Sequence, residues 1–119
     1  TFSPHIEAAT AYKISHGEAV AIDIALSAVI SAQRSILAWQ TCDLIVNTLK
    51  SVGLRVSVPA EVDTPALYDS LAAVVAHRAG ALNLVIPLAI GAVGYLEQWQ
   101  ELTFEQLQQA VTYLAVNND

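Results

Sequence analysis

The sequence predicts a mainly α-helical single domain, in which about five helices surround a buried central helix and a small β-hairpin is added. Helix-start signals recur along the chain, as capping residues followed by Pro or, three residues later, by Glu or Gln. Residues 19–30 are apolar on nearly every side of a helix, which is typical of a central element. Two short apolar runs, residues 82–86 and 93–96, predict the hairpin, with Gly91 and Gly94 near its turn.

The first two helices are predicted from their N-terminal signals. Ser3 and Pro4 indicate an N-cap and a first helical position, for a helix that runs to about Tyr12. Ser15 and Glu18 form a capping-box pattern, which opens a central helix expected to run to about Trp39. That helix carries one polar stripe, made of Asp23, Ser27, Ser31 and Arg34.

Three further helices follow from the same kind of signal. Thr41 is the expected cap of a helix that stops at Gly53. Thr64 and Pro65 open the next helix, which is expected to end near Gly80. A second capping box, Thr103 with Gln106, opens the last helix.

The length and composition bound the class of protein. A chain of 119 residues holds one hydrophobic core, so residues 1–119 are predicted to form a single domain. Charged residues make up only 13% of the chain, whereas average soluble domains contain about 25%. This charge-poor composition indicates burial against another domain or subunit, and we expect a homodimer. No membrane span is expected, because residues 19–30 are too short and contain Asp23.

Charge and cysteine content limit the partners and the compartment. The net charge is −6 and no basic cluster occurs, so binding to nucleic acid is not expected. Cys42 is the single cysteine, which excludes an intrachain disulfide and fits a reducing, cytoplasmic environment. The sequence contains no Met, even at position 1, so we expect the chain to be part of a longer protein.

Candidate metal ligands gather near the N-terminus. His5, Glu7, His16 and Glu18 lie within 14 residues of one another, and imidazole and carboxylate are common metal ligands. His5 and Glu7, like His16 and Glu18, are two residues apart, and such residues do not face each other on a helix. Spacing alone therefore predicts no metal cage. It leaves Glu18 as a cap and His16 as an ordinary helix-start residue.

Other polar residues have two interpretations each. Asp23 either lines a polar cleft beside Ser27 or pairs with a Lys or Arg from another domain. His77 and Arg78 either complement the dipole at a helix C-terminus or bind an anion such as phosphate. No nucleophile motif, phosphate loop or dinucleotide fingerprint occurs, so no catalytic residue is assigned.

Two segments carry a resemblance to a known family. Residues 1–7, Thr-Phe-Ser-Pro-His-Ile-Glu, and residues 16–22, His-Gly-Glu-Ala-Val-Ala-Ile, resemble the diagnostic stretch of the dehydroquinate-synthase superfamily of sugar-phosphate cyclases. Residues 80–87 and 102–107 resemble the family's short hairpin and the start of its last helix. The resemblance covers essentially all of the chain.

The resemblance implies a two-domain enzyme. An N-terminal domain, absent from this chain, would bind NAD, and this helical C-terminal domain would bind metal and substrate. The metal, Zn²⁺ or Co²⁺, would be held by two His and one Glu. His16 matches the second of these histidines, whereas the first would directly precede Thr1 and the Glu would lie upstream. His77, Arg78 and His5 become candidate residues for binding the phosphate or the substrate.

The implied reaction is a transient oxidation by NAD, loss of phosphate, re-reduction and an intramolecular aldol-type ring closure. The isolated 119-residue chain is expected to be inactive. Pro4 stands where dehydroquinate synthases have His, and Asp23 where they have Gly. At both positions the chain resembles the sedoheptulose-7-phosphate cyclases. His5 matches neither these cyclases nor the dehydroquinate synthases cleanly. The substrate is therefore either sedoheptulose 7-phosphate or that of 3-dehydroquinate synthase, and the alternative is a non-catalytic helical interaction or dimerisation domain.

Overall fold

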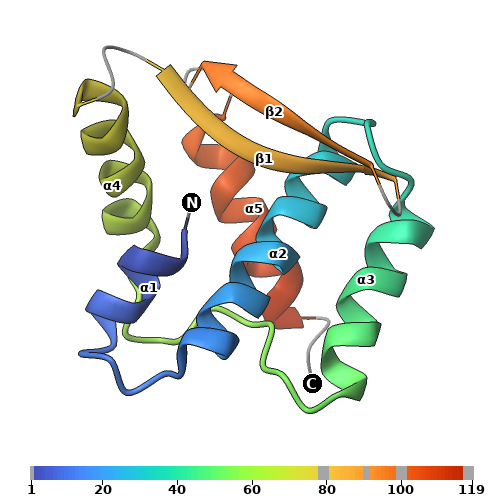
Figure 1. Ribbon diagram of the computed structural model, residues 1–119, viewed down its shortest axis with the longest axis horizontal. Helices are drawn as coiled ribbons and strands as arrows, with labels where there is room; N and C mark the ends of the chain where they lie inside the picture. Colours follow the sequence, from blue (N-terminus) through green and yellow to red (C-terminus); the bar gives the residue numbers. More distant parts are fainter. Residues whose placement is uncertain (1, 78–80, 90–91, 99–101, 117–119) are drawn as a thin grey trace.

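The computed structural model describes residues 2–77, 81–89, 92–98 and 102–116, and the side chains of residues 2–70 and 102–116. The chain folds into helices with a two-stranded sheet before the last of them (Figure 1). In chain order the elements are α1 (Ser3–Ala9), α2 (His16–Gln33), α3 (Trp39–Ser51), α4 (Thr64–His77), β1 (Ala81–Ala89), β2 (Ala92–Gln98) and α5 (Phe104–Val116). The predicted mainly α-helical fold is confirmed.

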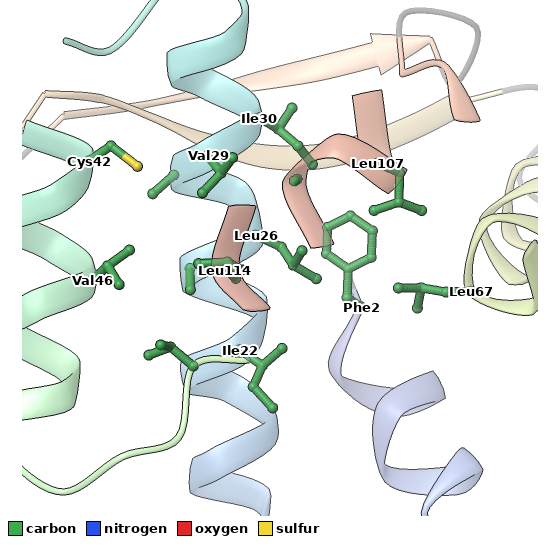
Figure 2. Close-up of a cluster of buried hydrophobic side chains, with 14 of the residues drawn as sticks. Phe2, Ile22, Leu26, Val29, Ile30, Cys42, Val46, Leu67, Leu107 and Leu114 are labelled. Atoms are coloured by element: carbon green, nitrogen blue, oxygen red, sulfur yellow. The ribbon is translucent and has the colours of Figure 1, made fainter. Parts of the chain in front are cut away.

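Helix α2 lies at the centre of the molecule, as its composition predicts (Figure 1). It packs against α1, α3, α5 and β1. Ile22, Leu26 and Ile30 follow one another at helical spacing and are fully buried. Figure 2 shows side chains from other elements arranged around them; Phe2, Cys42, Val46, Leu67, Leu107 and Leu114 belong to the same core.

The polar stripe of α2 faces other parts of the protein. Ser27 and Ser31 are buried within the packed helices. At the C-terminal end, Nη1 of Arg34 donates a hydrogen bond to Oε1 of Gln106, at 3.3 Å. Gln106 also accepts from the backbone N–H of Thr103, whose hydroxyl accepts from the N–H of Gln106 in return. The capping box of α5 is thus confirmed, and it ties the start of α5 to the end of α2.

Helix α2 ends at Gln33, so the predicted extension to Trp39 is wrong. Ser35 adopts a left-handed conformation, with φ of 60°. Its N–H donates to the carbonyl of Ala32, and the N–H of Ile36 donates to that of Ser31. This Schellman pattern satisfies the last carbonyls of the helix without a glycine.

The third helix begins earlier than predicted and ends where predicted. Ala38 is the N-cap of α3 and makes no side-chain capping bond, so the expected cap at Thr41 is wrong. Trp39 is the first residue of this helix rather than the end of α2. After α3, Gly53 has a φ of 86°, a conformation that glycine adopts without a steric cost. Its N–H donates to the carbonyl of Lys50, which confirms Gly53 as the stop.

The fourth helix and the hairpin complete the fold. Helix α4 begins at Thr64, as predicted, while its expected end near Gly80 lies outside the described residues. Strands β1 and β2 pair antiparallel, with Leu84 opposite Leu96 and Ile86 opposite Gly94. The pair crosses the end of the helical layer, and β1 packs on α2 (Figure 1). Within the described part of the chain, no helix is both long and apolar enough to cross a bilayer.

Candidate metal centre

The start of α1 is held by a carboxylate from another helix. Oδ2 of Asp23, in the middle of α2, accepts hydrogen bonds from the N–H groups of Phe2 and Ser3, at 3.0 and 3.1 Å. The predicted N-cap at Ser3 is wrong, because Phe2 is the N-cap residue and no side chain of its own caps the helix. The first N–H groups of a helix lack intrahelical partners. Asp23 therefore supplies the missing acceptor and a negative charge at the positive end of the helix dipole.

These contacts give Asp23 a role that neither sequence interpretation included. Its carboxylate accepts hydrogen bonds from two backbone N–H groups at the start of α1. An acid on such an apolar helix is costly unless it is paired. The start of α1 provides that pairing, and the position of Phe2 and Ser3 is fixed in return.

The end of α1 is fixed by a turn that lacks glycine. Helix α1 ends at Ala9, before the predicted end at Tyr12. Ala11 and Tyr12 both have left-handed backbones, with φ of 53° and 61°. The carbonyl of Glu7 accepts from the N–H of Tyr12 at 2.8 Å and from the hydroxyl of Thr10 at 3.1 Å. The backbone at Glu7 is thus tied to the turn that leads to α2.

The start of α2 is capped by Ser15, as predicted. The Ser15 hydroxyl accepts from the N–H of Glu18 at 3.1 Å and donates to the Glu18 carboxylate at 3.2 Å. The carboxylate of Glu18 therefore contacts the hydroxyl of Ser15 instead of its backbone N–H, which a full capping box would use. The cap places His16 at the first position of the helix.

The structure brings Glu7 and His16 together across the turn. Oε1 of Glu7 lies 2.6 Å from Nδ1 of His16, and the two side chains are 18% and 77% exposed. An ionised carboxylate has no proton to donate, so Nδ1 of His16 donates the hydrogen of this contact. In a neutral ring with its hydrogen on Nδ1, the lone pair lies on Nε2, and a neutral imidazole of this kind is a common metal ligand.

Among the described side chains, no other candidate residue joins this pair. His5 is partly buried on α1, and its Nε2 is enclosed with no hydrogen-bond partner among the residues described. His77 is the last residue of α4, but its side chain is not among those described, and Arg78 lies outside the described residues. Over the described ranges, no three His, Cys, Asp or Glu side chains form a metal-binding group. His16 is therefore a single candidate ligand.

A match to a protein-family model shows the family to which this chain belongs. A family model described as 3-dehydroquinate synthase C-terminal matches residues 1–74. The chain belongs to this family. The matched segment contains Glu7, His16 and Asp23, so the whole arrangement described above lies within the family's domain. The resemblance to the dehydroquinate-synthase superfamily is confirmed.

Curated relatives of this chain differ in activity. The 2-epi-5-epi-valiolone synthase of Streptomyces glaucescens is 36% identical over 97% of this chain. A 3-dehydroquinate synthase of a Cyanothece species is 30% identical over 82% of this chain. The chain spans only 30% of the length of the first relative and 27% of the second. Their sequences thus place the chain in a superfamily of sugar-phosphate cyclases.

A solved structure confirms the fold of the domain. The 2-epi-5-epi-valiolone synthase of Streptomyces hygroscopicus subsp. jinggangensis, solved with NAD⁺ and Zn²⁺ bound, matches with a TM-score of 0.86. The match covers 97% of this chain and 31% of that protein, at 29% sequence identity. The helical arrangement described above is therefore that of a domain from an enzyme that carries both groups.

Proposed function

We propose that this chain is the metal- and substrate-binding C-terminal domain of an NAD- and zinc-dependent sugar-phosphate cyclase of the sedoheptulose-7-phosphate branch. The observation that carries this proposal is the pair of Glu7 and His16 at the head of α2. A carboxylate on Nδ1, which leaves Nε2 of the neutral ring for a metal, is the arrangement of a metal-binding histidine. The zinc-bound relative of the same fold supports this assignment.

His16 fits zinc as one ligand of a shared site. Structural and catalytic zinc sites take at least three protein ligands, so residues beyond this chain would have to complete the site. We propose a histidine directly before Thr1 and a glutamate farther upstream. Asp23 supports this arrangement, because it holds the backbone of Phe2 and Ser3, two and three residues after the proposed histidine. Zinc, when bound, would polarise a substrate oxygen and stabilise its negative charge.

The residues of this chain would bind the metal and the substrate and would orient the ligand histidines. His16 would hold the metal, Glu7 would orient its ring, and Asp23 would fix the segment that follows the first ligand histidine. His77 and Arg78 would bind the substrate phosphate, a role that suits cationic side chains, and His5 would lie beside the substrate. The N-terminal domain would bind NAD. We further propose a cytoplasmic homodimer, from the charge-poor composition and the lone Cys42.

Two departures from dehydroquinate synthases support the sedoheptulose branch, and they act on the same helix start. Asp23 accepts from the N–H groups of Phe2 and Ser3, and Pro4 follows directly at the second helical position. Gly at position 23 would remove this acceptor. The two substitutions therefore form one local arrangement. The Streptomyces relative, at 36% identity, agrees with this branch.

The substrate assignment is tested on the full-length enzyme with NAD⁺ and Zn²⁺, by following release of inorganic phosphate. We expect turnover of sedoheptulose 7-phosphate and none of the seven-carbon linear heptulosonate phosphate. Turnover of the heptulosonate alone would establish a 3-dehydroquinate synthase, as the Cyanothece relative suggests. If neither substrate released phosphate, the non-catalytic interaction domain would be the better account. His16→Ala is the control for metal dependence and should abolish release.

A further inference from the structure

The carboxylate of Glu7, on α1, is hydrogen-bonded to the ring of His16, at the start of α2. We propose that Glu7 is a positioning residue, which fixes the tautomer and the ring orientation of His16 and so raises its affinity for the metal. This inference rests on the proposed function, since it takes His16 as a zinc ligand. It adds a residue that contacts neither the metal nor the substrate.

The two side chains differ in how firmly the protein holds them. The side chain of His16 is 77% exposed, so little packing restrains its ring. The side chain of Glu7 is only 18% exposed. At 2.6 Å, the distance between Nδ1 and Oε1 is that of a short, charge-assisted hydrogen bond. The less exposed carboxylate therefore holds the more exposed ring.

Glu7 is itself fixed by the residues on either side of it. Ile6, its neighbour on α1, is fully buried in the core. The carbonyl of Glu7 accepts two hydrogen bonds from the turn that follows, from Tyr12 and Thr10. The far end of α1 is held by Asp23. Both ends of the short helix are thus anchored, and the acceptor for His16 is in place before a metal binds.

The turn between the helices also favours this reading. Ala11 and Tyr12 both have left-handed backbones, and each such residue costs about 1–3 kcal/mol when it is not glycine. Backbones of this kind persist only where the surrounding structure enforces them. Here the turn brings Glu7 to His16, nine residues along the chain. The energetically costly turn thus places the carboxylate of Glu7 within hydrogen-bond distance of His16, the candidate metal ligand.

The chemical effect of Glu7 acts through the imidazole. With its hydrogen on Nδ1, the ring presents the Nε2 lone pair and needs no rearrangement to bind a metal. A carboxylate on the opposite nitrogen also makes the ligating nitrogen more basic. Loss of such a partner typically lowers metal affinity by about 10- to 100-fold. We expect a loss of that size here.

Zinc affinity of the full-length protein is the first test, measured by competition with a chromophoric chelator. Glu7→Ala should weaken zinc binding by about 10- to 100-fold. Glu7→Gln keeps an acceptor oxygen but loses the charge, so its loss should be smaller. Glu18→Gln is the matched control. It removes one negative charge near His16 and keeps a residue suited to the cap, so its affinity should stay within about twofold of the unchanged protein.

The tautomer of His16 is the second test, measured by ¹⁵N NMR on the metal-free full-length protein with labelled histidine. The unchanged protein should carry its hydrogen on Nδ1. In Glu7→Ala the hydrogen should move to a mixture of both nitrogens, while the circular dichroism of the helices stays the same. A purely structural role for Glu7 would not produce this change. If Glu7→Ala failed to fold, Glu7→Gln would still show a smaller tautomer shift, because its neutral amide accepts more weakly and can also donate to an unprotonated Nδ1.

The outcomes separate this inference from the proposed function. Unchanged zinc affinity in His16→Ala would overturn the ligand assignment and the inference together. A large loss in His16→Ala with unchanged affinity and tautomer in the Glu7 variants would overturn only the positioning role. An equal loss in Glu18→Gln and Glu7→Gln would also overturn it, because the effect would then come from local charge instead of the hydrogen bond.

Discussion

The carboxylate of Asp23 lies 3.1 Å from the backbone nitrogen of Ser3, and this contact joins the middle of α2 to the start of α1. The same oxygen accepts from the N–H of Phe2. A side chain on the buried central helix therefore takes the place of the missing cap on a neighbouring helix. It also fixes the position of α1, which carries Glu7 toward His16.

Removal of this carboxylate should loosen α1. Asp23→Ala leaves two partly buried N–H groups without their acceptor, which costs about 1–3 kcal/mol. Amide hydrogens of residues 2–9 should then exchange roughly 5- to 100-fold faster, as measured by mass spectrometry on the full-length protein. Asp23→Asn retains an acceptor oxygen and should show a smaller increase.

The control for this experiment is Asp69→Ala, which removes an exposed carboxylate from α4. Exchange in residues 2–9 should not change in this variant. If Asp23→Ala also left the exchange of α1 unchanged, Asp23 would not hold the helix.

The central position of α2 predicts a large difference between two chemically identical substitutions. Leu26 is fully buried on α2, whereas Leu44 on α3 is 57% exposed. Leu26→Ala should lower the free energy of unfolding by about 2–5 kcal/mol, because it removes core contacts and leaves a cavity. Leu44→Ala should cost under about 1 kcal/mol. Denaturant titrations of the two variants test this, and equal losses would contradict the assignment of α2 as the core helix.

The end of α3 offers a test of backbone strain without a steric clash. Gly53 has a φ of 86°, and a Cβ added there would meet no atom within 4 Å. Gly53→Ala should therefore destabilise the protein by about 1 kcal/mol through its backbone conformation alone. Gly17→Ala is the matched control, since it also adds a Cβ in open space but at a helical position. It should be neutral or stabilising by about 0.5–1 kcal/mol. A loss of stability in Gly17→Ala alone would contradict this reading of the two glycines.

Cys42 should be unreactive while the protein is folded. Burial, and then the charge of Asp43, raise the pKa of its thiol from 9.0 to about 11. Iodoacetamide at pH 9.0 should therefore alkylate Cys42 far more slowly in the native protein than in urea. Mass spectrometry of the peptide that contains Cys42 measures this, and equal rates would contradict the buried position.

The same shift of the pKa has a consequence for stability. The folded protein holds the proton of Cys42 more tightly than the unfolded chain does. Its stabilising contribution is therefore full below pH 9.0 and is lost as the pH rises through about 11. Cys42→Ala should show a weaker fall in stability over this interval.

Local signals predicted the starts of α2, α4 and α5, whereas the expected caps of α1 and α3 and the expected ends of α1 and α2 were wrong. Ser15 and Thr103 carry local signals, and the structure confirms both as caps. The ends of α1 and α2 depend on left-handed backbones at Ala11 and Ser35, residue types that rarely adopt them. Only the packed structure enforces these conformations, so no local pattern marks them. Gly53, which adopts such a backbone freely, was the one end that the sequence marked clearly.

The candidate site could be predicted only in part for a similar reason. The resemblance implied a ligand role for His16, but spacing along a single helix gave Glu7 no partner. The partner lies nine residues away on the next helix, across a turn whose geometry depends on Ala11 and Tyr12. Asp23 was likewise paired with backbone groups that no side-chain pattern reveals. Both contacts follow from how α1 packs on α2.

The central claim is that His16 binds the metal through Nε2 while Glu7 holds Nδ1. The most direct test is a crystal structure of the full-length protein with zinc, in which anomalous scattering locates the ion. The account predicts zinc about 2.0–2.1 Å from Nε2 of His16, the usual length of a zinc–histidine bond, with the Glu7 hydrogen bond retained. Zinc bound elsewhere, or bound through Nδ1 after loss of the Glu7 contact, would contradict it.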